Sequence, residues 1–122
     1  MIVNRILFQD NHLIAINKKS SEIVQGDRTG DSTMPDAIKT YLKDKYNKPG
    51  NVFCGVIHRL DRPTSGIILF ARTSKGLERM NKQFRDQQTS KTYWAILENK
   101  PPNATGTLVN YLKKNEKLNK SY

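Results

Sequence analysis

The chain has 122 residues, of which 36% are hydrophobic, and this is enough for one domain with a modest core. Lys and Arg number 21 against 11 Asp and Glu, so the formal net charge is +10, and the single cysteine excludes an internal disulfide. A positive surplus this large favours a polyanionic partner such as RNA or DNA, although a solvated basic surface would have the same composition.

The chain begins with an expected β-hairpin. Residues 5–18, "RILFQDNHLIAINK", contain two apolar runs around a polar turn at Asp10, Asn11 and His12. "EIVQG", residues 22–26, is a candidate third strand. The Gly-, Asp- and Thr-rich residues 26–33 predict a loop.

A first helix follows that loop. Its apolar side chains recur at helical spacing, at Met34, Ile38, Tyr41 and Leu42. Thr33 is a suitable N-cap, Pro35 suits the first turn, and Asp36 lies near the positive end of the helix dipole. The sequence "NKPG", residues 47–50, is expected to end the helix.

Two strands and a second helix are expected next. Residues 52–58, "VFCGVIH", are a strand candidate, and residues 66–72, "GIILFAR", read as a buried strand. Residues 73–88 form the helix, capped by Thr73 or Ser74, with an apolar stripe at Leu77, Met80 and Phe84. Lys75, Arg79 and Lys82 fall almost opposite that stripe, where they form either a phosphate-facing surface or a solvated helix face.

The remaining residues predict extended structure and a polar end. Residues 91–99, "KTYWAILEN", alternate like a strand, and residues 106–112, "GTLVNYL", resume extended structure after Pro101 and Pro102. Residues 113–122 predict a loose tail. Since the strands are not separated by regular crossover helices, we expect an α+β fold with a mixed, largely antiparallel sheet, in a single domain over residues 1–122.

The loop between the strands at 52–58 and 66–72 carries the chemistry. Asp61 stands between Arg59 and Arg62, and cations this near favour the ionised form that a carboxylate nucleophile needs. Pro63 fixes one φ, and Gly66 permits a φ that other residues resist. The plain alternative is a surface β-turn with an Asp–Arg pair. Thr64 and Ser65 are expected to bond the turn, because no His–carboxylate pair is apparent beside them.

The order of these residues resembles a known signature. His58-Arg59-Leu60-Asp61-Arg62-Pro63-Thr64-Ser65-Gly66 is similar to the signature loop of the RluA-like family of RNA pseudouridine synthases. The likeness continues through "IILFARTSKGLERMNKQFRDQQTSKTYWAIL", where Lys91, Tyr93 and Ala95 match a Lys-x-Tyr-x-Ala element. "FQDNHLIAINKKSSEIVQGD" resembles the opening hairpin of that family.

The resemblance implies that uridine within ribosomal or transfer RNA is isomerised to pseudouridine, with Asp61 as the catalytic aspartate. Tyr93 matches the active-site tyrosine that stacks on uracil; without the resemblance it reads as a strand aromatic. Arg59 is expected to contact the phosphate backbone or to fill the gap left by the target nucleotide, which must leave its stack. His58 and Arg62 are expected to shape the loop or touch RNA. The reaction implies no metal or organic cofactor.

The likeness stops short of the whole family pattern. A later Arg-Leu-x-Thr-Gly-Arg-x-His-Gln-Ile-Arg segment, which supplies a basic partner for the aspartate, has no match in residues 73–122. We therefore expect a truncated, N-terminal portion of the catalytic domain with little or no activity alone, whose exposed sheet edges would let two copies pair as a dimer.

The same residues are compatible with other classes of function. A noncatalytic RNA-binding module on the same scaffold is the main alternative, and an unrelated hydrolase using Asp61 is a weaker one. No second Cys/His pair joins Cys54 and His58, so no structural zinc site is expected. The N-terminal residues read as neither signal peptide nor membrane span, so we expect a soluble, cytoplasmic protein.

Overall fold

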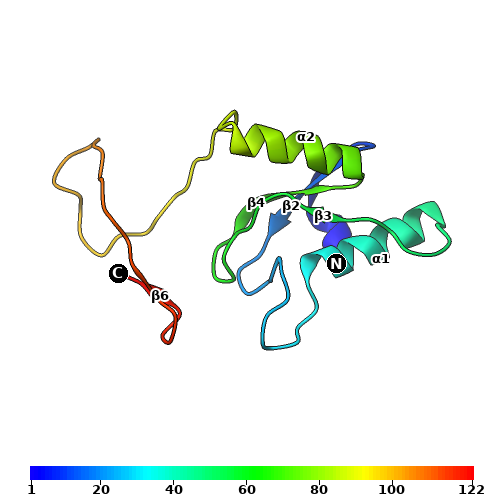
Figure 1. The fold of residues 1–122 in the computed structure, drawn as a ribbon, viewed down its shortest axis with the longest axis horizontal. Coiled ribbons are helices and arrows are strands. Elements are labelled where there is room, and N and C mark those ends of the chain that lie inside the picture. Colours follow the sequence, from blue (N-terminus) through cyan, green and yellow to red (C-terminus); the bar gives the residue numbers. More distant parts are fainter. The chain divides into compact units, whose positions relative to one another are not determined.

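A four-stranded antiparallel sheet organises the first part of the computed structural model, which describes residues 1–122. The strands are β1 (Ile6–Gln9), β2 (Leu13–Lys18), β3 (Gly55–Val56) and β4 (Gly66–Ala71), in the spatial order β1-β2-β4-β3. A short 3-10 helix, Ile2–Arg5, precedes β1. Helices α1 (Met34–Tyr46) and α2 (Ser74–Arg85) lie on opposite faces of this sheet (Figure 1). This arrangement confirms the expected α+β class.

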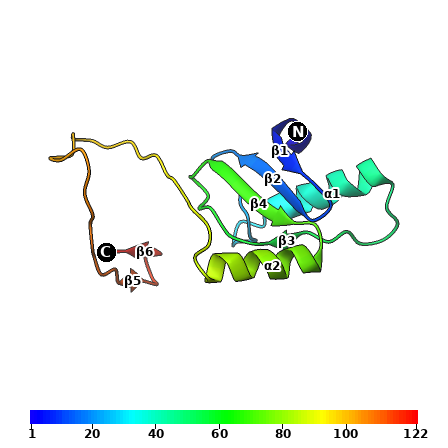
Figure 2. The ribbon, with the colours of Figure 1, turned by 90° about the horizontal axis from the view of Figure 1, so that it is seen from above.

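The expected hairpin joins β1 to β2. One carboxylate oxygen of Asp10 accepts hydrogen bonds from the backbone N–H groups of His12 and Leu13, at 2.8 and 2.7 Å. An aspartate that bonds the backbone two and three residues on stabilises a tight turn. Figure 2 shows β2 continuing from this turn to lie beside β4 in the middle of the sheet.

Helix α1 begins and ends as its sequence predicts. The Thr33 side chain accepts from Asp36 N, and the Asp36 carboxylate accepts from Thr33 N, which forms a reciprocal capping box. Asn47 ends the helix in the left-handed conformation, with φ 52°. The buried face of the helix packs on the sheet to form the core, which consists of Ile14, Ile16, Val24, Met34, Ile38, Leu42, Ile68 and Phe70.

Helix α2 is capped by Thr73, whose hydroxyl accepts from Gly76 N at 3.0 Å. A Cβ at Gly76 would lie 2.8 Å from the carbonyl oxygen of His12, so the helix start approaches the hairpin turn too closely for any larger residue. The predicted stripe of Leu77, Met80 and Phe84 is half-buried. Neither helix is long and apolar enough to cross a membrane.

Two of the expected strands before α2 are shorter or absent. Residues 22–26 form no strand, because the carbonyl of Ile23 accepts from Met34 N at 2.9 Å, at the start of α1, instead of pairing with the sheet. Ile23 and Val24 are nevertheless buried. Of the strand expected over residues 52–58, only Gly55–Val56 pairs, and it pairs with β4.

Residues Lys91–Tyr122 form a unit separate from Met1–Ser90. The strand expected over residues 91–99 is wrong: none of these residues pairs with a strand, and Trp94 is 98% exposed. Alternation alone cannot make a strand, because its backbone groups need a neighbour to bond. The extended run expected over residues 106–112 likewise joins no strand.

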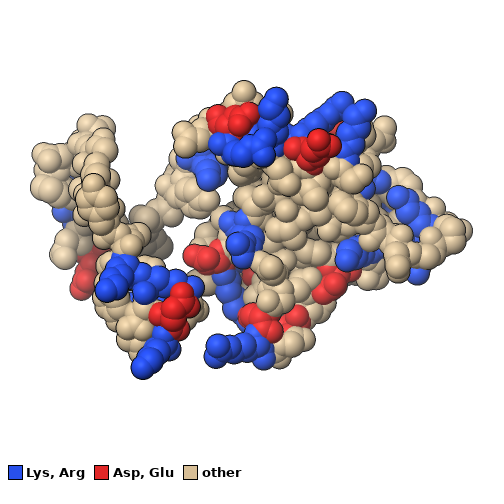
Figure 3. Space-filling view, in the orientation of Figure 1, with Lys and Arg blue, Asp and Glu red and all other residues tan.

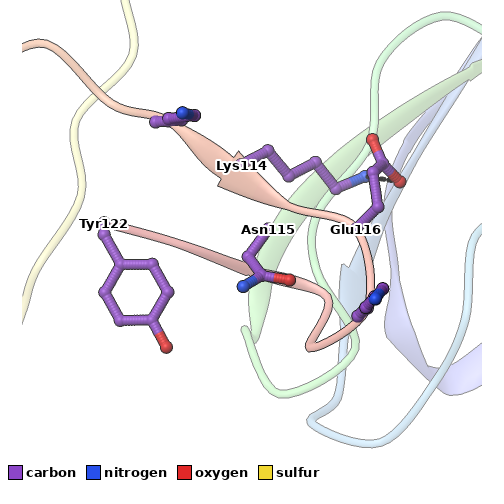
Figure 4. A pocket seen from close by; sticks show the side chains of 6 residues that line it. Lys114, Asn115, Glu116 and Tyr122 are labelled. Carbon is purple, nitrogen blue, oxygen red and sulfur yellow. Dashed lines mark ion pairs between the residues drawn. The ribbon is translucent and has the colours of Figure 1, made fainter.

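The expected loose tail forms a small hairpin. Strands β5 (Lys114–Asn115) and β6 (Lys120–Ser121) pair, and Lys113 and Tyr122 exchange two backbone bonds of 2.9 and 3.0 Å. Figure 4 shows Lys114 reaching toward Glu116, an ion pair of 3.7 Å, above the hollow that Asn115 and Tyr122 help to line. A two-stranded hairpin of this kind is marginally stable by itself in water.

Candidate functional site

The loop between β3 and β4 has a defined backbone shape. Thr64 N donates to the carbonyl of Asp61 at 3.0 Å, which closes a turn over residues 61–64. Gly66 follows with φ 138°, a conformation that side chains resist, and this confirms the expectation placed on that glycine. Ser21 N donates to the carbonyl of Arg62 at 2.8 Å, so the segment after β2 is bonded to the same turn.

A buried lysine holds this turn from beneath. Lys18 ends β2 on the face that carries Ile14 and Ile16, and it is 1% exposed. Its Nζ donates to the carbonyl oxygens of Asp61 and Arg62 at 3.1 Å each and of Thr64 at 2.6 Å, and to its neighbour Lys19 at 3.1 Å. Burial lowers the pKa of Lys18, while the charges of Glu22 and Asp61 oppose that shift.

Sequence reasoning missed Lys18. The signal was present, because Ile14, Ile16 and Lys18 alternate on one face of a strand, and a lysine at the third position must be buried with its charge bonded. What the alternation does not show is the partner, since the turn at 61–64 lies more than forty residues along the chain.

The two arginines of the loop bond residues other than Asp61. Arg62 forms ion pairs with Asp27, at 3.0 Å, and with Asp31. Arg59 donates to the Gln25 amide oxygen at 2.6 Å. Neither guanidinium bonds the Asp61 carboxylate, so the surface Asp–Arg pair of the plain alternative is absent; Arg62 pairs instead with two carboxylates of the loop at residues 27–31.

These contacts tie the segment 25–31 to the Asp61 loop. Thr29 donates to the Asp27 carboxylate from its backbone N at 2.9 Å and also from its hydroxyl. Bonds from Thr29 and the Arg62 guanidinium lower the pKa of Asp27, and the Arg62 bond is the largest cause that lowers the pKa of Asp31. Both carboxylates are thus held ionised, which keeps Arg62 in place.

The Asp61 carboxylate itself is exposed and accepts no hydrogen bond from the chain. It lines an open cleft of about 240 Å³ whose other walls are residues 23–25, Asp27, 59–60 and Arg62. Exposure in such a cleft leaves both oxygens available to a bound molecule. Arg59 and Arg62 border the same cleft, so three of the predicted site residues lie together.

His58 is half-buried at the start of the loop. Its Nε2 accepts from Leu69 N at 3.0 Å, and its ring stacks on Phe84 of α2 with centroids 5.0 Å apart. The imidazole therefore joins β4 and α2 to the beginning of the Asp61 loop. This geometry favours the expectation that His58 shapes the loop.

Tyr93 belongs to the other unit, Lys91–Tyr122, where its side chain is 61% exposed. The Asp61 cleft is formed by residues of the unit Met1–Ser90 alone, and Tyr93 stays a predicted site residue. The hollow of the β5–β6 hairpin contains none of the predicted residues.

Metal binding and cysteine chemistry were the other uses that these residue types could have. No group of three or more His, Cys, Asp or Glu side chains is placed to hold a metal ion. Burial raises the pKa of the Cys54 thiol to about 12, so this cysteine is protonated at neutral pH and is a poor nucleophile.

Comparison with known proteins identifies relatives of this chain. A family model described as RNA pseudouridylate synthase matches residues 12–122. Ribosomal large subunit pseudouridine synthase C of Buchnera aphidicola is 34% identical over 96 residues, which cover 79% of this chain and 29% of that protein. The tRNA pseudouridine synthase C of Haemophilus ducreyi is 41% identical over 92 residues, which cover 75% of this chain and 36% of that protein.

A solved structure supports the fold. The human protein RNA pseudouridylate synthase domain containing 4 superposes with a TM-score of 0.61 at 25% identity, covering 71% of this chain and 31% of that one. These matches confirm the resemblance drawn from the signature loop. The chain spans about a third of the length of these relatives.

Proposed function

This chain belongs to the RNA pseudouridylate synthase family, and we propose that it forms part of an enzyme that isomerises uridine to pseudouridine in RNA, with Asp61 as the catalytic carboxylate. The observation that carries the proposal is the Asp61 side chain, which is exposed in a cleft and bonded to nothing else, on a turn whose backbone is fixed by Lys18.

The isomerisation of uridine needs an accessible, ionised carboxylate near the sugar. The N1–C1′ bond of uridine breaks, uracil turns, and a C5–C1′ bond forms as C5 loses its proton and N1 gains one. Positive charge that develops on the sugar is stabilised by an ionised carboxylate nearby, as in glycoside chemistry. Asp61 either attacks C1′ or assists formation of a glycal. Because its turn is pinned at three carbonyls, the carboxylate is presented with little reorganisation.

The neighbouring residues have supporting roles in this proposal. Arg59, exposed at the rim, contacts the phosphate backbone or fills the space of the flipped nucleotide. Arg62 holds the 27–31 loop, of which Asp27 lines the cleft, and His58 anchors the start of the catalytic loop. Tyr93 stacks on the uracil.

The RNA is ribosomal or transfer RNA in this proposal, since the related proteins carry both kinds of substrate in their names. We also propose that residues 1–122 alone have little or no activity. The measurement is pseudouridine formation on unmodified RNA by the purified chain, and robust conversion would contradict this part of the proposal. The proposed dimer through sheet edges predicts a doubled mass by light scattering.

The decisive experiment replaces Asp61 by Asn, at the chromosomal locus, in the enzyme of which this chain forms part, and maps pseudouridine in cellular RNA. We expect one or more uridines to lose the modification completely while the protein remains at normal abundance. Asp44→Asn, an exposed aspartate on α1, is the matched control and should leave the map unchanged. If every pseudouridine persists in the Asp61→Asn strain, the enzymatic proposal fails, and the alternative of a noncatalytic RNA-binding module is favoured.

A further inference from the structure

The outer face of α2 carries a one-sided row of cations. Lys75, Arg79 and Lys82 are exposed, and their i, i+4, i+7 spacing sets them on one face over about 10 Å of helix. The half-buried stripe of α2 lies on the opposite side, against the sheet. Figure 3 shows Lys and Arg side chains gathered over α2 at the top of the view.

These cations have no partner within the chain. None of Lys75, Arg79 and Lys82 takes part in any of the ion pairs of the structure, and the helix offers one carboxylate, Glu78, against four cations. The fourth, Arg85, pairs with Asp86 at 3.7 Å.

Two arginines of the same unit are paired with carboxylates. Arg5 is bonded by Glu22 at 2.6 Å, and Arg62 is bonded by two aspartates. Because three unpaired cations lie on one face of α2, positive potential is concentrated on that helix.

The helix is also fixed next to the candidate site. Phe84 stacks on His58, the residue that begins the Asp61 loop, with centroids 5.0 Å apart. Leu77 packs on Gly55 of β3 so closely that a Cβ there would lie 3.0 Å from Leu77 Cδ2. The cationic row therefore cannot shift relative to the strand that leads into the Asp61 loop without breaking both contacts.

We propose that the Lys75–Arg79–Lys82 row binds the phosphate backbone of the RNA strand whose target uridine enters the Asp61 cleft. The identity of this polyanion rests on the proposed function. Lysine and arginine on an exposed helix face contact phosphates without reading bases, so the row supplies affinity and register rather than sequence choice.

The test compares two double variants of the full 122-residue chain. Lys75→Gln/Arg79→Gln removes two cations of the row, and Lys39→Gln/Lys43→Gln removes two exposed cations at the same i, i+4 spacing on α1. Binding to a fluorescein-labelled single-stranded RNA is followed by anisotropy between about 0.05 and 0.3 M salt.

Counterion release sets the expected size of the effect. Each phosphate contact contributes about 0.7 to the slope of log K against log[salt] for a single strand, so losing two lowers the slope by about 1.4. At about 0.1 M salt that corresponds to roughly 25-fold weaker binding. The α1 variant should retain the wild-type slope and affinity.

The outcomes separate this proposal from the proposed function. Equal slopes for the two variants would refute the α2 surface, while pseudouridine formation that depends on Asp61 in cells would still stand. If the wild-type chain does not bind RNA but binds phosphatidylserine vesicles through the same row, the partner is a membrane and the proposal is overturned.

Discussion

Replacing Lys18 by Met tests whether one buried ammonium shapes the Asp61 loop. Met keeps most of the apolar stem volume but removes the three N–H donors that bond the carbonyls of Asp61, Arg62 and Thr64. A hydrogen bond to a charged group contributes about 1.5–3 kcal/mol, and leaving a buried acceptor unbonded costs about 1–3 kcal/mol. Relief of the desolvation of Lys18 offsets part of this loss.

We therefore expect the free energy of unfolding to fall by about 2–3 kcal/mol in Lys18→Met. With a urea slope of about 1.5 kcal/mol per molar, the unfolding midpoint drops by about 1.3–2 M. Circular dichroism during urea titration measures this, and hydrogen exchange reports the loop directly: the Thr64 amide, which bonds Asp61 O, should lose protection.

Lys19→Met is the matched control, because Lys19 is adjacent in sequence and its side chain is exposed. Its free energy of unfolding should stay within about 0.5 kcal/mol of the wild-type value. If Lys18→Met unfolds together with this control and its Thr64 amide stays protected, the ammonium does not hold the turn, and the reasoning that links Lys18 to the Asp61 loop is refuted.

Three further changes probe the surroundings of the site. Arg62→Gln removes both bonds to Asp27 and Asp31, so trypsin should cut after exposed Arg28 a few-fold faster, whereas an unchanged rate would show that these ion pairs do not order the loop. Bonds from Arg5 lower the pKa of Glu22, so the stability that ionised Glu22 contributes is complete above the ordinary pKa of 4.5 and is lost as pH falls through the lower folded-state pKa. Glu22→Gln should therefore flatten the pH dependence of the free energy of unfolding below pH 4.5. A profile parallel to that of the wild type would contradict this. Thr33→Ala removes the α1 cap and should cost about 1 kcal/mol in urea unfolding, against no change for exposed Ser32→Ala.

Local features of the fold were predictable because they depend on near neighbours. Thr33, Asp36 and Asn47 begin and end α1 through bonds that span at most a few residues, and the Asp10 turn is equally local. The signature loop was recognisable for a similar reason: its residues are contiguous, and Gly66 occupies a backbone conformation that its sequence position already suggested.

The partners of the charged side chains depended on contacts between distant segments. Lys18 donates to carbonyl oxygens more than forty residues away, and Arg62 forms ion pairs with Asp27 and Asp31 rather than with its neighbour Asp61. No spacing rule could identify those bonds. The Lys18 bonds require β2 to pair with β4, and the Arg62 bonds require the 27–31 loop to lie beside the turn.

The strand expected at residues 91–99 illustrates the same limit. Its alternating side chains were read correctly as a pattern, yet a strand exists only when another strand accepts its backbone bonds, and none does here. Residue order thus decided the helix ends, the hairpin turn and the chemistry offered at Asp61. Three-dimensional packing decided which charges are neutralised, which carboxylate stays open to a ligand, and which extended segments become strands, because those outcomes are set by pairing between remote parts of the chain.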